Sequence, residues 1–332
     1  MYEFLGLSLI LAGLMTLHVP ASFLTTLVWR ALGGWTERWT AASRARALFT
    51  LRVLPAAIAL FGALLLLAPA YLIHEPRHAA EAVSLKLGAL AALSAAGILL
   101  ALWRGASAYL TTRALVGDWM KNARPIDLGL PIPAYELRHS FPVIAVVGIF
   151  RPRLFIADHL FDALTRDELA AAIAHECGHL ASRDNLKRAV LRVCRDVLTI
   201  VPSGRSLDRA WAHASEEAAD EYAARNGGPA ALDLASALVK IARVAPAGAS
   251  PLLPAGTMIL GESVATIAGR VQRLTRIASA EAGTTTRPSR WSIAFFRLLG
   301  AALAIAGLSV AADSSALAAI HRVIETAVSS LQ

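Results

Sequence analysis

Two histidines and a glutamate form the most informative pattern in the sequence, His175-Glu176-Cys177-Gly178-His179. On a helix, residues four positions apart lie one turn apart on the same face, so both imidazoles can reach one metal ion. Glu176 then lies beside the metal, where its carboxylate can accept a proton from the attacking water molecule. The pattern predicts a zinc site with a general base. On its own, it also fits two surface histidines with a glutamate between them.

An acidic stretch further along the chain offers a third ligand. Glu216 and Asp220 share a helix face by the same spacing, and we expect Glu216 to complete a His, His, Glu site. Such a site binds one Zn²⁺ per chain and leaves an open position for water. We expect Asp220 to accept a hydrogen bond from the second ring nitrogen of His175, which fixes its tautomer. The pair Glu217 and Glu221 is the second-ranked register, and an ordinary acidic helix face is the structural alternative.

Further candidate contacts carry a weaker signal. His213 and Arg225 lie near the third ligand in the sequence and are candidates to stabilise the oxyanion or contact substrate, although a structural role is favoured for each. A strand near 143–147 is expected to pair with an extended substrate. Cys177 is interpreted as a small filler residue, and with Cys194 it forms no C-x-x-C pair, so no disulfide framework is expected.

Helix signals surround the metal motif. Thr165 and Glu168 form a capping box, which predicts that a helix begins there and runs through the two histidines. A second helix is expected at 185–200 and a third from 207 to 226, where Asn-Gly-Gly ends it. Pro229 then opens a fourth helix. These elements would hold the three metal ligands on two neighbouring helices.

Strand signals precede the helices. Residues 135–149 and 153–157 are rich in Val, Ile and Phe, which predicts strands of a small sheet. From about residue 113 to 285 the composition is that of a globular protein. The region with the metal motif is therefore expected to be a small α+β domain.

The composition of the whole chain indicates a membrane protein. The 332 residues are 56% hydrophobic and 17% charged, whereas soluble domains contain about 25% charged residues. The mean hydropathy is +0.54. Three apolar runs, 5–29, 53–73 and 87–103, are predicted to cross a bilayer. The first has no basic segment before it and no clear cleavage site, so a retained helix is favoured over a signal peptide.

A fourth apolar run, 291–312, contains Arg297 near its start and is also predicted to span, with an interfacial or packed helix as the alternative. An amphipathic helix is expected after it, at 317–331. Basic residues gather between the first two runs and after the third, which places the N-terminus outside and the metal motif in the cytoplasm. The net charge of +8 is therefore interpreted as orientation in a bacterial-type inner membrane, and no direct nucleic acid binding is expected.

Several stretches together resemble a family of membrane gluzincin metallopeptidases, the BlaR/MecR type of β-lactam sensor-transducers, and more distantly the HtpX type. The similarity covers roughly residues 113–276. It is carried by residues 147–156, 164–169, 173–179 and 183–185, and by the Glu-x-x-x-Asp of Glu216 and Asp220.

The resemblance implies zinc held by His175, His179 and Glu216, with Glu176 as the base, in a cytoplasmic protease domain. Two features depart from it. The sensors carry a large penicillin-binding domain after the fourth helix, whereas only residues 313–332 follow here, so β-lactam sensing is not expected. The family often has a cysteine where this chain has Ala219, a change that we expect to be tolerated.

The expected fold is a mostly α integral membrane protein with about four transmembrane helices and an inserted α+β zincin domain. The expected segments are three transmembrane helices in 1–104, a cytoplasmic metalloprotease domain in 105–289, a fourth transmembrane helix in 290–312, and a short amphipathic helix in 313–332.

The expected function is a membrane-embedded zinc metalloendopeptidase that hydrolyses a cytosolic or membrane protein, in signalling or in membrane protein quality control. The expected partners are a protein or peptide substrate, a transcriptional repressor among them by the resemblance, and membrane lipid; oligomerisation stays open. The alternative is a non-catalytic membrane receptor or scaffold, which would not need Glu176. A transporter is disfavoured because Lys86 and Arg297 lie only near the ends of apolar runs.

Overall fold

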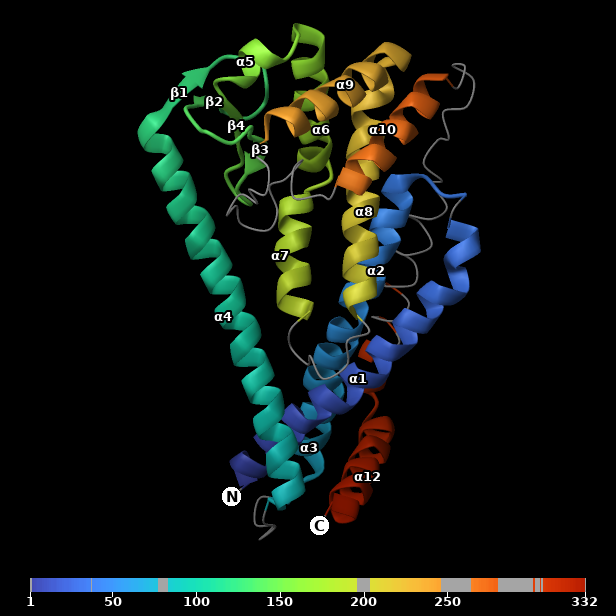
Figure 1. The fold of residues 1–332 in the computed structure, drawn as a ribbon. Coiled ribbons are helices and arrows are strands. Elements are labelled where there is room, and N and C mark those ends of the chain that lie inside the picture. The colour runs from blue at the N-terminus through green and yellow to red at the C-terminus, as the bar shows by residue number, and fades with distance from the viewer. Residues whose placement is uncertain are drawn as a thin grey trace.

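The computed structural model describes residues 2–36, 38–76, 83–195, 204–245, 264–279 and 307–331, together with positions 301 and 305. Long helices form one part of the molecule, and a small sheet with shorter helices forms the other (Figure 1). Both termini of the described chain lie at the end of the long helices that is remote from the sheet (Figure 1).

Three helical stretches are long and apolar enough to cross a membrane, as the sequence predicts. They are α1 (Tyr2–Thr36), the continuous stretch of α2 (Ala41–Phe61), the π-helix η1 (Gly62–Leu67) and α3 (Ala68–His74), and α4 (Leu85–Asn122). The N-terminus of α2 is capped by the Thr40 side chain and that of α4 by the Ser84 side chain.

Helix α4 connects the bundle to the sheet. It has 38 residues, which at 1.5 Å per residue makes it about 57 Å long, roughly twice the hydrocarbon thickness of a bilayer. It runs through position 104 without a break and leads directly into the first strand (Figure 1). The predicted segment boundaries stay predictions.

The predicted C-terminal helix is present as α12 (Ser314–Leu331) and packs against α3. Most of the fourth apolar run, 291–312, falls outside the described residues.

The sheet has four strands in the order β1-β2-β4-β3. Strands β2 and β4 are parallel, and the other two pairs are antiparallel. The strands are β1 (Ala123–Ile126), β2 (Ala134–Leu137), β3 (Ile144–Val147) and β4 (Arg153–Ala157).

The run 135–149, for which the sequence predicts strand structure, is not one continuous strand. The run splits into β2 and β3, because β4 lies between them and pairs with both. Strand β1 was not predicted, since it contains Pro125 and is only half-buried. Proline is tolerated there because β1 lies at a sheet edge.

Strand β3 forms the other edge of the sheet and joins β4 through a tight turn. Gly148 in this turn has φ +109°, a conformation that side chains rarely adopt, and a Cβ there would lie 2.8 Å from the carbonyl oxygen of Arg151. The turn therefore requires glycine, and it leaves one side of β3 facing the metal motif helix, which packs against this strand.

Six α-helices follow the sheet among the described residues up to position 279. Gly227, with φ +108°, separates α9 from the preceding 3₁₀ turn η2 (Ala224–Asn226), and Pro229 lies in the first turn of α9, as predicted. The helices are α5 (Leu160–Ala163), α6 (Arg166–Ala181), α7 (Asp184–Arg195), α8 (Gly204–Ala223), α9 (Gly228–Val244) and α10 (Val264–Ser279). Residues 196–200, predicted to extend the second helix, fall outside the described residues.

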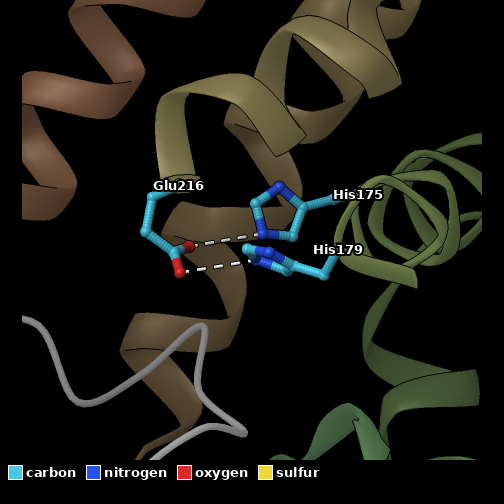
Figure 2. Close-up of side chains that lie close together, drawn as sticks. All are labelled: His175, His179 and Glu216. Carbon is cyan, nitrogen blue, oxygen red and sulfur yellow. Dashed lines mark ion pairs between the residues drawn. The ribbon is translucent and has the colours of Figure 1, made fainter. Parts of the chain in front are cut away.

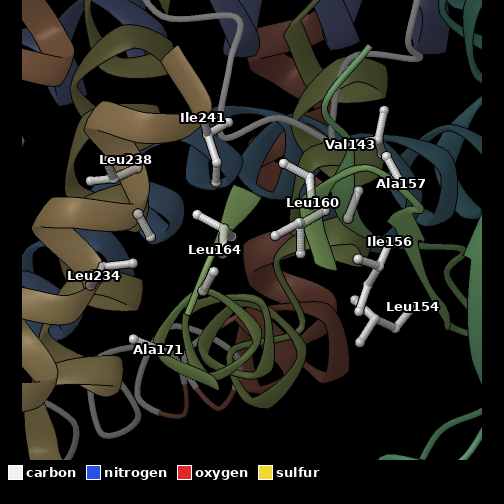
Figure 3. Packing of buried hydrophobic residues seen from close by; sticks show 14 of the residues in the cluster. Val143, Leu154, Ile156, Ala157, Leu160, Leu164, Ala171, Leu234, Leu238 and Ile241 are labelled. Atoms are coloured by element: carbon white, nitrogen blue, oxygen red, sulfur yellow. The ribbon is translucent and has the colours of Figure 1, made fainter. Parts of the chain in front are cut away.

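One hydrophobic core lies between the sheet and helices α6 and α9 (Figure 3). Leu154 and Ile156 from β4 and Leu234 from α9 are fully buried in it. A second cluster joins the membrane helix α2 to α7 and α8. Its buried members are Ala45, Leu48, Leu191, Leu207, Trp211 and Ala214. This packing fixes α8, and with it the third ligand, on the membrane helices.

Candidate metal centre

The capping box predicted at the start of α6 is present. The backbone N–H of Glu168 donates to the Thr165 hydroxyl at 3.2 Å, and the backbone N–H of Thr165 donates to the Glu168 carboxylate at 2.7 Å. That carboxylate also accepts from Ser236 and Lys240 on α9. The start of the histidine helix is thus held both locally and by the neighbouring helix.

Helices α6 and α8 approach closely at the metal motif. A Cβ on Gly178 would lie 3.0 Å from the Cα of Ala219, so a side chain at either position is limited by the other helix. Ala219 is 2% exposed. Small residues at both positions bring the two histidines of α6 within reach of Glu216 on α8.

The two histidines and Glu216 point toward one another (Figure 2). The Nε2 atom of His175 lies 3.5 Å from one carboxylate oxygen of Glu216, and the Nε2 atom of His179 lies 3.4 Å from the other. Tetrahedral zinc with bonds of about 2.0–2.1 Å separates its ligand atoms by about 3.4 Å. All three residues are buried, and their spacing is that of a zinc site.

The electrostatics of the pocket favour a cation. Burial opposes the charged form of His175, but Asp220 and Glu216 raise its pKa above the usual value. Burial opposes charge on His179 too, yet Glu216 and Asp184 raise its pKa to about 10. For Glu216, burial opposes ionisation, but the two histidines hold its pKa well below the usual range. A divalent ion can replace the two protons that this pocket stabilises on the imidazoles.

A buried oxygen also fits the metal. The Oε2 atom of Glu216 is buried and has no hydrogen-bond partner among the residues that the structure describes, although the Nη1 atom of Arg270 lies 3.4 Å from it. Buried carboxylate oxygens without a partner are costly, and a metal bond removes that cost. The ligand set of two imidazoles and one carboxylate is the one that zinc uses in hydrolytic sites with an open position.

Each histidine contacts a carboxylate through its other ring nitrogen. The Nδ1 atom of His175 lies 2.9 Å from Asp220, as expected from the sequence, and that of His179 lies 2.8 Å from Asp184. Both carboxylates are buried. Sequence reasoning missed Asp184, although the stretch 183–185 carried part of the family resemblance. Asp184 follows shortly after α6, so its closeness to His179 in the sequence is the signal that could have identified it.

Two arginines complete the pocket, and sequence reasoning missed both. Arg270 on α10 is 4% exposed. Its Nε and Nη2 atoms donate to the two carboxylate oxygens of Asp220 at 3.0 and 2.6 Å. Burial opposes ionisation of Asp220, but Arg270 and His175 lower its pKa to about 2. Arg188 on α7 donates to Glu216 at 3.1 Å. No motif marks these arginines, because they reach the site from separate helices.

Glu176 is buried and faces the edge strand β3. Its carboxylate accepts a hydrogen bond from the backbone N–H of Val146 at 2.9 Å. The side-chain amide of Asn185 donates to the carbonyl oxygen of the same residue at 2.9 Å. The backbone N–H and C=O of Val146 are thus hydrogen-bonded to Glu176 and Asn185, which lie close to the metal ligands.

The remaining candidates lie elsewhere on α8 and η2. His213 has a side chain that is 62% exposed and lies 3.7 Å from Glu217. The guanidinium of Arg225 stacks over the Tyr222 ring at 4.6 Å. Their role at the oxyanion stays a prediction. In the second-ranked register, Glu217 and Glu221 pair with arginines, Glu217 with Arg44 and both with Arg273.

The buried triad on two helices defines a zinc metallopeptidase, carried by a protein with three candidate membrane spans. Residues 145–207 match the model of peptidase family M48. The match runs from β3 into the start of α8 and includes both histidines, whereas Glu216 follows it. The BlaR/MecR-type relationship is not part of this match. A search of curated proteins finds no match to the chain.

Proposed function

We propose that the chain is a membrane-embedded endopeptidase with Glu176 as its general base, acting on a cytosolic or membrane protein. The observation that carries the proposal is the position of the Glu176 carboxylate, one residue from a zinc ligand and within hydrogen-bond distance of an edge strand. His175, His179 and Glu216 would hold the zinc. When bound, zinc supplies a Lewis acid that polarises the scissile carbonyl and makes water acidic enough to attack near neutral pH.

The protein's own groups then handle the proton and the substrate. Glu176 accepts the proton of the attacking water and passes it to the leaving amine. Asp220 and Asp184 hold the histidine rings in place through their Nδ1 atoms. An extended substrate would pair with the outer edge of strand β3 and there replace the contacts of Val146 with Glu176 and Asn185, so that the scissile bond lies next to Glu176.

A glutamine at position 176 tests the proposal, because it keeps the shape of the side chain and removes its basicity. We expect Glu176→Gln to lower kcat of peptide cleavage by roughly 10²–10⁴-fold. The protein should keep about one catalytic zinc, measured by mass spectrometry of the metal. Unchanged cleavage with zinc retained would remove Glu176 from the base role.

The orientation and the physiological role extend the same proposal. The arginine-rich segments between the first and second apolar runs and after the third apolar run support a protease domain in the cytoplasm. The resemblance to BlaR/MecR-type peptidases supports signalling through a single substrate, such as a transcriptional repressor. The HtpX-type resemblance supports quality control of many membrane proteins. Comparing the proteomes of cells with the wild-type chain and with Glu176→Gln separates them, since one stabilised protein favours signalling and many favour quality control.

A further inference from the structure

A second group of metal-ligand side chains lies where α12 packs against the end of α3. It consists of Glu75, His321 and Glu325, with the ring of His74 beside it. This group lies at the opposite end of the long helices from the zinc site (Figure 1). It plays no part in the hydrolysis proposed above.

The spacing of the group resembles that of the zinc site. The Nε2 atom of His321 lies 3.5 Å from a carboxylate oxygen of Glu325 and 3.8 Å from one of Glu75. These distances exceed those of ordinary N–H···O hydrogen bonds, about 2.9–3.0 Å. They lie near the separation of about 3.4 Å between ligands of tetrahedral zinc. In the catalytic triad the corresponding distances are 3.5 and 3.4 Å.

The burial of the group suits a bound ion with access from solvent. The side chain of Glu75 is 6% exposed and that of His321 13%, whereas that of Glu325 is 56% exposed. The three residues offer two carboxylate oxygens and one imidazole nitrogen within 4.8 Å of one another, which is a ligand set for a divalent cation.

The ring of His74, next to this group, also supports a bound ion. The rings of His74 and His321 are tilted by 31° to each other, with centroids 5.8 Å apart. The Nε2 atom of His74 and the Nδ1 atom of His321 are buried and have no hydrogen-bond partner within the described part of the chain. The junction therefore gathers two imidazoles and two carboxylates from α3 and α12, and leaves two polar nitrogens unpaired.

We propose that Glu75, His321 and Glu325 bind a divalent transition-metal ion, and that this ion fastens α12 to the end of the second span. Imidazole together with carboxylate favours zinc and its neighbours in the transition series over calcium and magnesium, which prefer oxygen ligands alone. The metal links residues 246 positions apart, Glu75 and His321. It would hold the helix that follows the last apolar run on the side of the membrane opposite the protease domain.

Zinc binding by a variant that lacks the catalytic metal ligands tests this proposal. The full-length chain with His175→Ala and His179→Ala is purified in detergent, equilibrated with zinc chloride, freed of excess metal by gel filtration and analysed for bound zinc. We expect about one zinc per chain. Adding Glu325→Gln or His321→Gln should weaken this binding by at least roughly tenfold. A matched control is Val323→Ala, on the same helix with a side chain 69% exposed, which should keep the zinc.

Hydrogen exchange of the α12 amides is a second measurement that tests the proposal. Zinc should slow hydrogen exchange of the α12 amides in the double variant, and this effect should vanish with Glu325→Gln, a change at an exposed side chain that leaves packing intact. Absence of zinc from the double variant would overturn the proposal and would leave a protonated His321 between two carboxylates. Zinc that survives both Glu325→Gln and His321→Gln would overturn it as well. Neither result bears on the catalytic site, which the double variant lacks.

Discussion

At the scale of single residues, the metal centre depends on groups that touch the ligands. Asp184 and Asp220 each contact the far nitrogen of one histidine, and both are buried. Such contacts fix the tautomer and the ring orientation that metal binding requires. The carboxylates therefore belong to the centre as much as the three ligands do.

The contact between Asp184 and His179 leads to a prediction for zinc affinity. Asp184→Asn keeps the size of the side chain but removes its charge, so we expect zinc affinity to fall by roughly 10–100-fold. The dissociation constant can be measured by competition with a chromophoric chelator. Asp118→Asn, at a side chain 71% exposed on α4, is the control. Equal affinities of the two variants would show that Asp184 does not support the metal.

At the scale of elements, α10 is attached to α8 through buried charge. Arg270 is paired with Asp220, and Arg273 donates to the backbone of Glu217 at 3.0 Å. Helix α10 also packs against α9 and buries Leu274 there.

Removing the buried arginine should therefore destabilise the domain. Arg270→Gln removes the guanidinium that pairs with the buried Asp220 carboxylate and leaves it only His175, and we expect a loss of about 3–5 kcal/mol. Denaturant unfolding of the purified chain measures this loss. Arg276→Gln, an exposed change on the same helix, should cost about 0.5 kcal/mol or less. If the two variants have the same free energy of unfolding, Arg270 does not anchor α10.

The start of α6 gives a prediction for pH. Burial opposes ionisation of Glu168, but Lys240, Ser236 and the Thr165 N–H lower its pKa from 4.5 to about 2. A lowered pKa contributes stability above pH 4.5, and this contribution is lost as pH falls toward 2. Glu168→Gln keeps the capping box and loses the charge, so its melting temperature should lie below that of the wild type at about pH 7, with a smaller gap at about pH 3. A gap that does not shrink on acidification would contradict this pKa.

At the scale of the whole molecule, the protease domain and the membrane helices are joined by packing and charge. Arg52 on α2 is 4% exposed and donates to Asp208 on α8 at 2.9 Å. The cluster of Leu48, Leu207 and Trp211 packs around the same contact. The helix that supplies the third ligand is therefore held by a membrane span, and movement of that span would move Glu216.

A labelling experiment can test the orientation of the molecule in the membrane. In a chain without its two native cysteines, Phe150→Cys introduces a thiol at a side chain 83% exposed near the sheet. Ser315→Cys introduces one at the start of α12, at the opposite end (Figure 1). We expect a membrane-impermeant maleimide to label Ser315→Cys in intact cells and Phe150→Cys only after lysis. The reverse pattern would overturn the proposed orientation.

The sequence by itself determined the features that depend on local spacing. The two histidines one helical turn apart, the capping box of Thr165 and Glu168, and the three apolar runs are all set by neighbouring residues. The third ligand could be predicted too, because Glu216 and Asp220 share one face of a single helix. Local periodicity is enough for each of these.

Only the tertiary structure decided which separate elements meet at the site. Arg270 reaches Asp220 across 50 residues of chain, and Glu176 meets Val146 across 30. The splitting of 135–149 into β2 and β3 depended on β4 coming between them. Such contacts form when separate helices and strands pack together, and no local pattern encodes them. The sequence thus supplied the ligands of the metal, and the fold supplied the charges and the strand edge around it.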